Sequence, residues 1–273
     1  MTKENEQGES RRFSPAEETG VAAFGLSLVL AFFHIEWVIV PLSIFIFICL
    51  AAPFFPSLGF FLPVISRGHT GKSVVSLTFD DGPDPLTTRP LLHLLRLHAV
   101  KATFFVTGEK AEEYVDLIEE ILVDGHDIGN HSYRHDPLLM LRSYQTLCRE
   151  IDATQAVLNR FGILPVAFRP PAGITSPKLG PVLHKRKLYC VTYTCRALDA
   201  GNKHIRGMSS KILKKVKPDD IILLHDTHPK DKGSEEAWLK EIDSMLSGLK
   251  SKELRIITLA ELIGKPVMVK NMK

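Results

Sequence analysis

Apolar residues run almost without interruption from Gly20 to Ile65, and the chain beyond them alternates between short apolar stretches and amphipathic segments. A bilayer span needs roughly 20 apolar residues. The run therefore predicts two membrane-spanning helices, at about 20–39 and 43–64, joined by a tight turn near Pro41.

The ends of this run are less regular than its middle. Residues 1–19 are polar and charged, so we predict a disordered tail there. Prolines at 53, 56 and 63 predict an irregular second span. Only His34 and Glu36 are ionisable within the run, and we interpret them as a turn at the membrane interface.

From residue 67 onward, β-rich runs alternate with amphipathic runs of helical period. This alternation indicates βα units, a parallel sheet and an α/β fold. About seven such units favour a barrel over a small open sheet. The predicted strands are 74–79, 101–108, 126–132, 166–168, 188–194, 221–226 and 254–259. The predicted helices are 89–97, 109–123, 143–161, a helix starting at 176–177, 207–216 and 235–249.

Composition adds little that changes this picture. The chain has 273 residues, 45% hydrophobic and 24% charged, with a formal net charge of +3. No Lys/Arg-rich run is present, so we expect no nucleic-acid partner. The four cysteines show no metal-site spacing, which predicts reduced, mostly buried thiols.

Polar clusters follow the predicted strands where each strand ends. In a barrel of parallel strands, the catalytic residues lie at these carboxyl ends. Five clusters at five strand ends are difficult to explain by packing alone, so they predict one active site. They are Asp80-Asp81, His131 to His135, Arg169-Pro170-Pro171, Asp199 and His225-Asp226.

His131 and His135 are spaced so that one helical turn would point both imidazoles the same way. Two histidines and one carboxylate make a three-ligand zinc site with open positions. The same ligand set suits non-haem iron, so the ligands alone do not fix the reaction. Of Asp80 and Asp81, one would bind the metal while the other faces the substrate; an ordinary Asp-Gly-Pro turn is the alternative.

The ordered motifs resemble those of the polysaccharide deacetylases, carbohydrate esterase family 4 with the NodB-homology domain. They are Thr78-Phe79-Asp80-Asp81-Gly82-Pro83, His131-Ser132-x-x-His135, Arg169-Pro170-Pro171-x-Gly173 and Leu223-x-His225. The resemblance covers about residues 72–262. It implies a distorted (β/α) barrel of about seven strands with a zinc-type active site, here preceded by an N-terminal transmembrane helical hairpin.

The resemblance also implies a role for each motif residue. Asp80 resembles the catalytic base and His225 the catalytic acid, while Asp81, His131 and His135 resemble the metal ligands. Arg169 would orient the base, and Asp199 would orient the acid histidine. Ala172, beside Pro170 and Pro171, is the expected backbone donor to the oxyanion.

Two positions depart from the family pattern. Ala172 stands where the family often has Tyr, and Ala200 follows Asp199 where a Trp is usual. A backbone donor survives the first change, but the apolar wall around the substrate is altered. We therefore expect an unusual acceptor rather than ordinary chitin or peptidoglycan.

The expected activity is metal-dependent removal of an N-acetyl group from an N-acetylated sugar, polysaccharide or glycolipid precursor. The expected cofactor is a divalent metal, Zn²⁺ first, with Co²⁺ or Ni²⁺ as alternatives. Two alternatives stay open: a deformylase or amidase acting on a lipid-linked sugar, and a non-catalytic carbohydrate-binding membrane protein.

Charges beside the spans predict the topology. Arg11 and Arg12 precede the first span and Arg67 and Lys72 follow the second, while the turn between the spans has no Lys or Arg. Positive flanks stay cytoplasmic, so we expect an integral protein of the cytoplasmic membrane whose catalytic domain faces the cytoplasm. The expected divisions are a tail at 1–19, a membrane anchor at 20–66 and a catalytic domain at 67–273.

Overall fold

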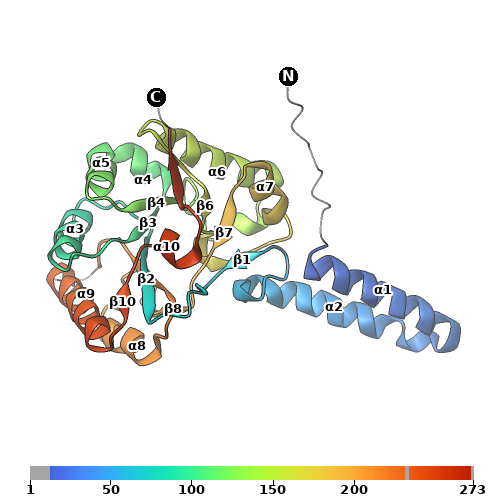
Figure 1. The fold of residues 1–273 in the computed structure, drawn as a ribbon. Helices are drawn as coiled ribbons and strands as arrows, with labels where there is room; N and C mark the ends of the chain where they lie inside the picture. The colour runs from blue at the N-terminus through green and yellow to red at the C-terminus, as the bar shows by residue number, and fades with distance from the viewer. Residues whose placement is uncertain (1–12, 231–233, 272–273) are drawn as a thin grey trace, which may run out of the picture.

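Two apolar helices lie side by side at the start of the chain and project from one side of an α/β domain (Figure 1). The structure is a computed structural model that describes residues 13–230 and 234–271. The paired helices are α1 (Pro15–Phe33) and α2 (Ile39–Ala51), and we refer to them as the hairpin.

Helix α1 begins at Pro15, so the predicted tail at 1–19 extends too far. Ser14 caps the helix: its hydroxyl accepts a hydrogen bond from the backbone N–H of Glu17, whose carboxylate accepts one from the N–H of Ser14. This reciprocal capping box, with Pro15 in the first turn, starts the helix before the apolar run does. Residues 1–12 of the predicted tail lie outside the described residues.

The turn of the hairpin lies at His34–Val38, not near Pro41 as predicted, and includes η1 (Ile35–Trp37). Pro41 stands in the first turn of α2, where a missing N–H costs no helical hydrogen bond. The irregular end of the second span is confirmed. Helix α2 stops at Ala51 and is followed by the 3₁₀ turns η2 (Ala52–Phe54) and η3 (Pro56–Leu58).

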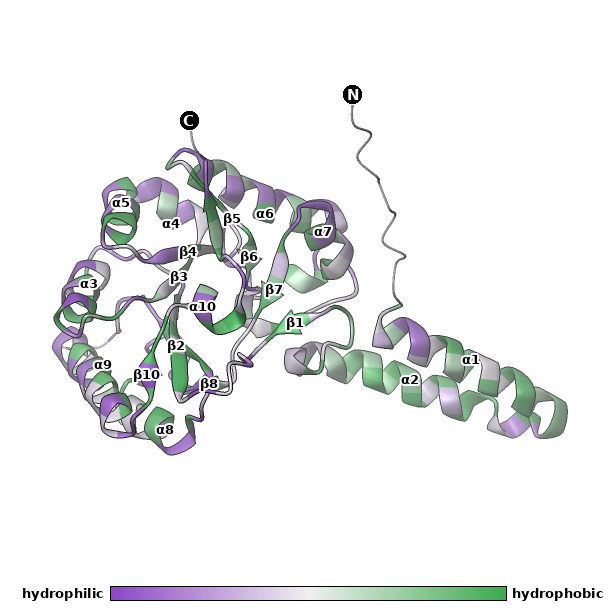
Figure 2. Cartoon of the chain, in the orientation of Figure 1, coloured by the Kyte–Doolittle hydropathy of each residue, from purple (hydrophilic) through white to green (hydrophobic). Residues whose placement is uncertain are grey.

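The hairpin is mostly apolar, with its most hydrophilic residues at the start of α1 and in the turn (Figure 2). Among the described residues, Pro15–Phe33 and Ile35–Phe54 are long and apolar enough to cross a membrane, and only 11% of each is buried within the protein. A core helix of a soluble protein would be mostly buried, so these exposed apolar faces need another cover.

The domain that follows is a half-barrel of parallel strands, which confirms the predicted α/β fold. Nine strands form its sheet in the order β1-β7-β6-β4-β3-β2-β9-β8, with β10 also paired to β2. The strands are β1 (Val64–Ile65), β2 (Val74–Asp80), β3 (Thr103–Val106), β4 (Asp127–Asn130), β6 (Ala167–Phe168), β7 (Tyr189–Val191), β8 (Cys195–Arg196), β9 (Ile221–His225) and β10 (Arg255–Ile256). All predicted strands are present; β1 and β8 were not predicted.

Helices surround this sheet, with α10 across one end (Figure 1). They are α3 (Thr88–Leu97), α4 (Gly108–Glu113), α5 (Val115–Val123), α6 (Tyr144–Asn159), α7 (Leu179–Lys185), α8 (Met208–Lys215), α9 (Ser234–Ser251) and α10 (Leu259–Ile263). The helix predicted at 109–123 is divided into α4 and α5 at Tyr114, which leaves the helical conformation. A separate antiparallel pair is formed by β5 (Ile163–Pro165) and β11 (Met268–Lys270), and the short turns η4 (Leu139–Leu141) and η5 (Pro171–Gly173) follow β4 and β6.

The boundary predicted at residues 66 and 67 does not divide the structure cleanly. Strand β1 pairs with β7 inside the sheet. Ala52, Phe61 and Leu62 are buried in the same cluster as residues of η4, α6 and α7. The segment that follows the hairpin is therefore part of the core of the α/β domain. All four cysteines are free thiols, as predicted.

Candidate active site and metal centre

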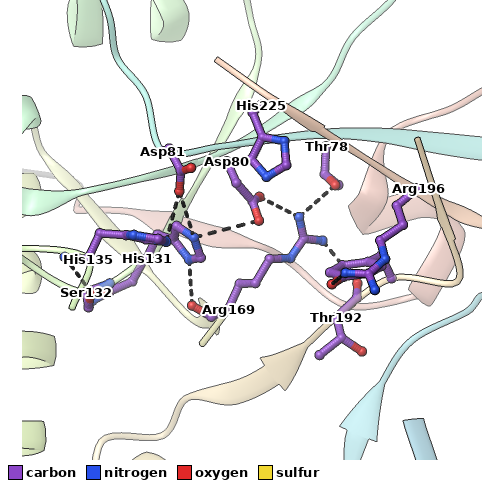
Figure 3. A network of polar contacts seen from close by, with 12 residues as sticks. Thr78, Asp80, Asp81, His131, Ser132, His135, Arg169, Thr192, Arg196 and His225 are labelled. Atoms are coloured by element: carbon purple, nitrogen blue, oxygen red, sulfur yellow. Dashed lines mark hydrogen bonds and ion pairs between the residues drawn. The ribbon is translucent and has the colours of Figure 1, made fainter. Parts of the chain in front are cut away.

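The carboxylates of Asp80 and Asp81 diverge where β2 ends (Figure 3). Asp80 is the last residue of the strand and is buried. Asp81 has φ 71°, in the left-handed region, so the chain turns sharply between the two residues. The two side chains consequently have different neighbours.

Asp81 faces two imidazoles. Its Oδ1 lies 3.3 Å from Nε2 of His131 and 3.0 Å from Nε2 of His135. The ligand atoms of the three residues all lie within 4.8 Å of one another, as binding of a single metal ion requires. Asp81 Oδ1 is buried and has no well-formed hydrogen bond within the described chain. Such an oxygen suits a cation better than a hydrogen-bond donor.

The two histidines do not lie on a helical turn, so that prediction was wrong. Residues 131–135 form a bend, with φ 66° at Ser132 and φ 53° at His135. The backbone N–H of His135 donates to the hydroxyl of Ser132. The N–H groups of Tyr133 and Arg134 donate to one carboxylate oxygen of Glu150 on α6, at 3.0 and 2.8 Å. The bend is thus held by α6.

Charges within the cluster move its pKa values in a consistent way. Burial alone would raise the pKa of Asp81, but the adjacent imidazoles bring it well below its usual range. Burial would lower the pKa of His131, and the carboxylates of Asp80 and Asp81 raise it instead. Burial and the neighbouring His131 lower the pKa of His135. The cluster therefore holds an ionised carboxylate against two imidazoles.

Arg169, which follows β6, links the end of β2 to the residue after β7. Its side chain is fully buried. Its Nη1 donates to Asp80 Oδ1 at 2.6 Å and to the hydroxyl of Thr78 at 2.7 Å, and its Nη2 donates to the carbonyl of Thr192 at 3.0 Å. The backbone carbonyl of Arg169 accepts a hydrogen bond from Nδ1 of His131 at 2.7 Å. In the neutral ring, that bond places the proton on Nδ1 and leaves Nε2, which is directed at Asp81, as the nitrogen that can bind a cation.

His225 and Asp199 form a second pair at the same end of the sheet. Nδ1 of His225 donates to Asp199 Oδ2 at 2.8 Å. Burial alone would lower the pKa of His225, but this hydrogen bond and the nearby carboxylates raise it to about 9. The side-chain amide of Asn202 donates to the carbonyls of His225 and Thr227, at 3.0 and 2.7 Å, and holds the loop that carries Asp199 against β9.

The loop after β6 brings Pro170, Pro171 and Ala172 to this end of the sheet. Ala172 has φ 55° and ψ 8°, inside η5. Proline has no N–H, so the N–H of Ala172 is the first one in the loop after Arg169.

Residues 67–191 match the sequence model of the family described as polysaccharide deacetylase. A chitooligosaccharide deacetylase from Azorhizobium caulinodans is 34% identical over 172 residues, which are 62% of this chain and 81% of that protein. The chain belongs to the polysaccharide deacetylase family.

Some relatives extend well beyond the region they share with this chain, and others do not. A peptidoglycan-N-acetylglucosamine deacetylase from Listeria monocytogenes is 31% identical over 209 residues, 76% of this chain. This chain spans only 42% of that protein's length. A solved peptidoglycan N-acetylglucosamine deacetylase superposes with a TM-score of 0.66 at 31% identity, over 75% of this chain and 94% of that one.

All the site residues predicted from the sequence of this family member lie at one end of the sheet. The family-model match ends before Asp199 and His225, which the structure nevertheless brings together. Four contributors were not predicted: Thr78, the carbonyl of Thr192, Glu150 and Asn202. Thr78 lies in the first motif, so the sequence did contain a signal for it. Thr192 contributes a backbone carbonyl, which leaves no signal in the sequence, and Glu150 and Asn202 contribute side chains that bind the backbone of segments distant in the chain.

Proposed function

We propose that this polysaccharide deacetylase is a divalent-metal-dependent hydrolase that removes the N-acetyl group from an amino sugar. One observation carries the proposal: a three-ligand cluster lies beside a carboxylate fixed by arginine and near a histidine fixed by aspartate. A nucleophile, a base and an acid are what amide hydrolysis requires.

Asp81, His131 and His135 would hold the metal. Two imidazole nitrogens and one carboxylate oxygen suit zinc, and also cobalt or nickel. The buried Asp81 Oδ1, close to both Nε2 atoms yet without a well-formed hydrogen bond in the described chain, supports this assignment. A bound divalent cation would polarise the amide carbonyl and acidify water.

Asp80 is proposed as the general base. Arg169 occupies its Oδ1, which leaves Oδ2 as the oxygen that takes a proton from the attacking water. Arg169 is itself fixed by its hydrogen bonds to Thr78 and Thr192. Its guanidinium carbon also lies 4.0 Å from the centre of the Phe105 ring, which further restricts the side chain. The base is thereby held in one orientation.

His225 is proposed as the general acid. Asp199 holds its Nδ1 proton, so the Nε2–H of the protonated ring is the one that can pass to the leaving amine. Its raised pKa keeps the ring protonated at neutral pH. The N–H of Ala172 is proposed to donate to the oxyanion as the carbonyl becomes tetrahedral.

The hairpin is proposed as a membrane anchor rather than a removable signal. Its exposed apolar length supports a membrane setting. Ala16 of α1 and Cys49 of α2 pack against the core cluster of the catalytic domain, contacts that cleavage within the hairpin would disturb. We further propose, from the positive flanks, that the catalytic domain faces the cytoplasm.

A substrate panel tests the proposed activity. The full chain in detergent, stripped by a strong chelator, should release no acetate from N-acetylated chitooligosaccharides or peptidoglycan fragments. Zinc, cobalt or nickel should restore release. Full turnover in a sample shown to contain no metal would overturn the proposal.

A further inference from the structure

The hairpin is packed into the catalytic domain instead of being tethered to it by a linker. The backbone N–H of Ala16 donates to the carbonyl of Phe60 at 3.0 Å, which ties the start of α1 to the segment after η3. The buried cluster at this junction includes Ala52, Phe61, Leu62, Leu139, Met140 and Leu179. The hairpin therefore sets the position of the active site relative to the bilayer.

The active site lies close to the residues where the hairpin ends. The backbone N–H of Thr175 donates to the carbonyl of Pro53 at 3.3 Å. Thr175 is three residues after Ala172, and three residues of chain span at most about 11 Å. Ala172 is thus within about 15 Å of Pro53. His135 is five residues from Met140 in the junction, a span of at most about 18 Å.

The hairpin has the length of one bilayer crossing. Helix α1 has 19 residues, so it is about 28 Å long, close to the roughly 30 Å of a hydrocarbon core. Pro53, two residues past the end of α2, consequently lies near one bilayer surface. The active site is then at the depth of the lipid headgroups or just beyond them.

A mainly apolar crevice of about 1460 Å³, whose lining also includes Glu17 and His184, separates the hairpin from α7. Its walls include Val21 of α1, Phe45 of α2 and Gly180 of α7. Pro177, another lining residue, is two residues after Thr175 in the loop that leads from Ala172. Because two walls are hairpin helices, the crevice is continuous with the space that membrane lipid would fill.

We propose that the active site works at the bilayer surface on an N-acetylated sugar carried by a membrane lipid, with the lipid's apolar tail in this crevice. This inference rests on the proposed function and names its substrate class. Exposed apolar side chains beside the junction fit the same setting: Leu138 and Leu141 flank the buried part of η4, and Leu141 is 78% exposed.

Turnover in nanodiscs tests the inference. The full chain with zinc would be embedded with a dialkyl lipid bearing N-acetylglucosamine on a short spacer, or with the same lipid and sugar on a spacer several times longer than 15 Å. Free diacetylchitobiose is the soluble substrate. Both lipids have the same surface density, so their comparison isolates reach. We expect at least ~10-fold faster turnover with the short spacer.

A matched pair of variants tests the crevice. Val21→Trp would fill it, whereas Val29→Trp places the same side chain farther along α1, outside the crevice lining. The ratio of turnover of the short-spacer lipid to that of the soluble sugar should fall ~10-fold in Val21→Trp and stay constant in Val29→Trp. Equal turnover of both spacers, or an unchanged ratio in Val21→Trp, would overturn the inference while the proposed function stands. No turnover of any acetylated sugar would overturn both.

Discussion

Asp80 and Asp81 are adjacent in the chain, but their carboxylates have different neighbours. Asp80 is paired with a buried guanidinium, and Asp81 is close to two imidazoles. Removal of a general base abolishes proton transfer but leaves the metal bound, whereas removal of a metal ligand weakens metal binding. The two proposed roles are therefore separable by substitution.

Asp80→Asn should lower kcat by ~10²–10⁴-fold and leave the metal bound, since the amide cannot take a proton. His131→Ala should weaken metal binding by more than ~100-fold, because loss of a residue that only supports a metal ligand already weakens binding by ~10–100-fold. Bound metal would be measured by elemental analysis after gel filtration, and kcat by acetate release. Loss of metal from Asp80→Asn, with partial activity retained, would mean that the two aspartates have exchanged roles.

The Asp199–His225 pair predicts a pH dependence. The folded-state pKa of His225 is raised to about 9, so the acid is protonated below that pH and activity falls as pH rises through it. Any stability that the pair adds is likewise complete below the unfolded pKa of about 6.5 and lost as pH rises through about 9. Asp199→Asn removes the partner.

In Asp199→Asn, the alkaline limb of kcat/KM should move down by at least ~1 pH unit. A bound cation would offset part of the rise in the His225 pKa that Asp81 causes, and it would do so in the wild type and in Asp199→Asn alike. The quantity to compare is therefore the difference between the pH profiles of the two proteins. Identical alkaline limbs would remove His225 from the role of acid.

At the scale of elements, helix α6 holds the bend that carries the proposed metal ligands. Glu150 accepts hydrogen bonds from the N–H groups of Tyr133 and Arg134, which lie between His131 and His135 in the chain. Glu150→Ala should lower metal affinity ~10–100-fold while kcat at saturating metal is largely kept. The exposed Glu119 of α5 provides the matched control, Glu119→Ala. Metal titration by calorimetry measures both, and equal affinities would contradict a supporting role for α6.

Much of the fold and most of the site could be predicted from the sequence, since strand periodicity and strand-end polarity are local signals. The two-residue strands β1 and β8 could not be predicted, because two residues carry no period. The turn of the hairpin was predicted near Pro41 because proline disfavours a helix interior. Proline is tolerated in the first turn of a helix, however, and Pro41 lies in the first turn of α2. The bend at 131–135 could not be predicted either, since its support comes from the distant Glu150.

For the whole molecule, topology is the open prediction. A hairpin returns the chain to the side where it began, and the turn contains Glu36 but no Lys or Arg. With the full chain fused at its C-terminus, a fluorescent protein should be bright and alkaline phosphatase inactive. An active phosphatase with a dark fluorescent protein would place the catalytic domain outside and return cell-wall polymer to consideration as substrate.

The burial of Ala52, Phe61 and Leu62 beside α6 and α7 also bears on how the protein is made. If the hairpin inserts into the bilayer as proposed, it does so before α7 is synthesised, and the α/β domain then folds against a segment that is already in place. A chain shortened to begin at residue 67 would lack those side chains. Loss of a buried Leu or Phe side chain from a core costs about 2–5 kcal/mol, so a soluble form of the domain should retain the chain from about residue 51.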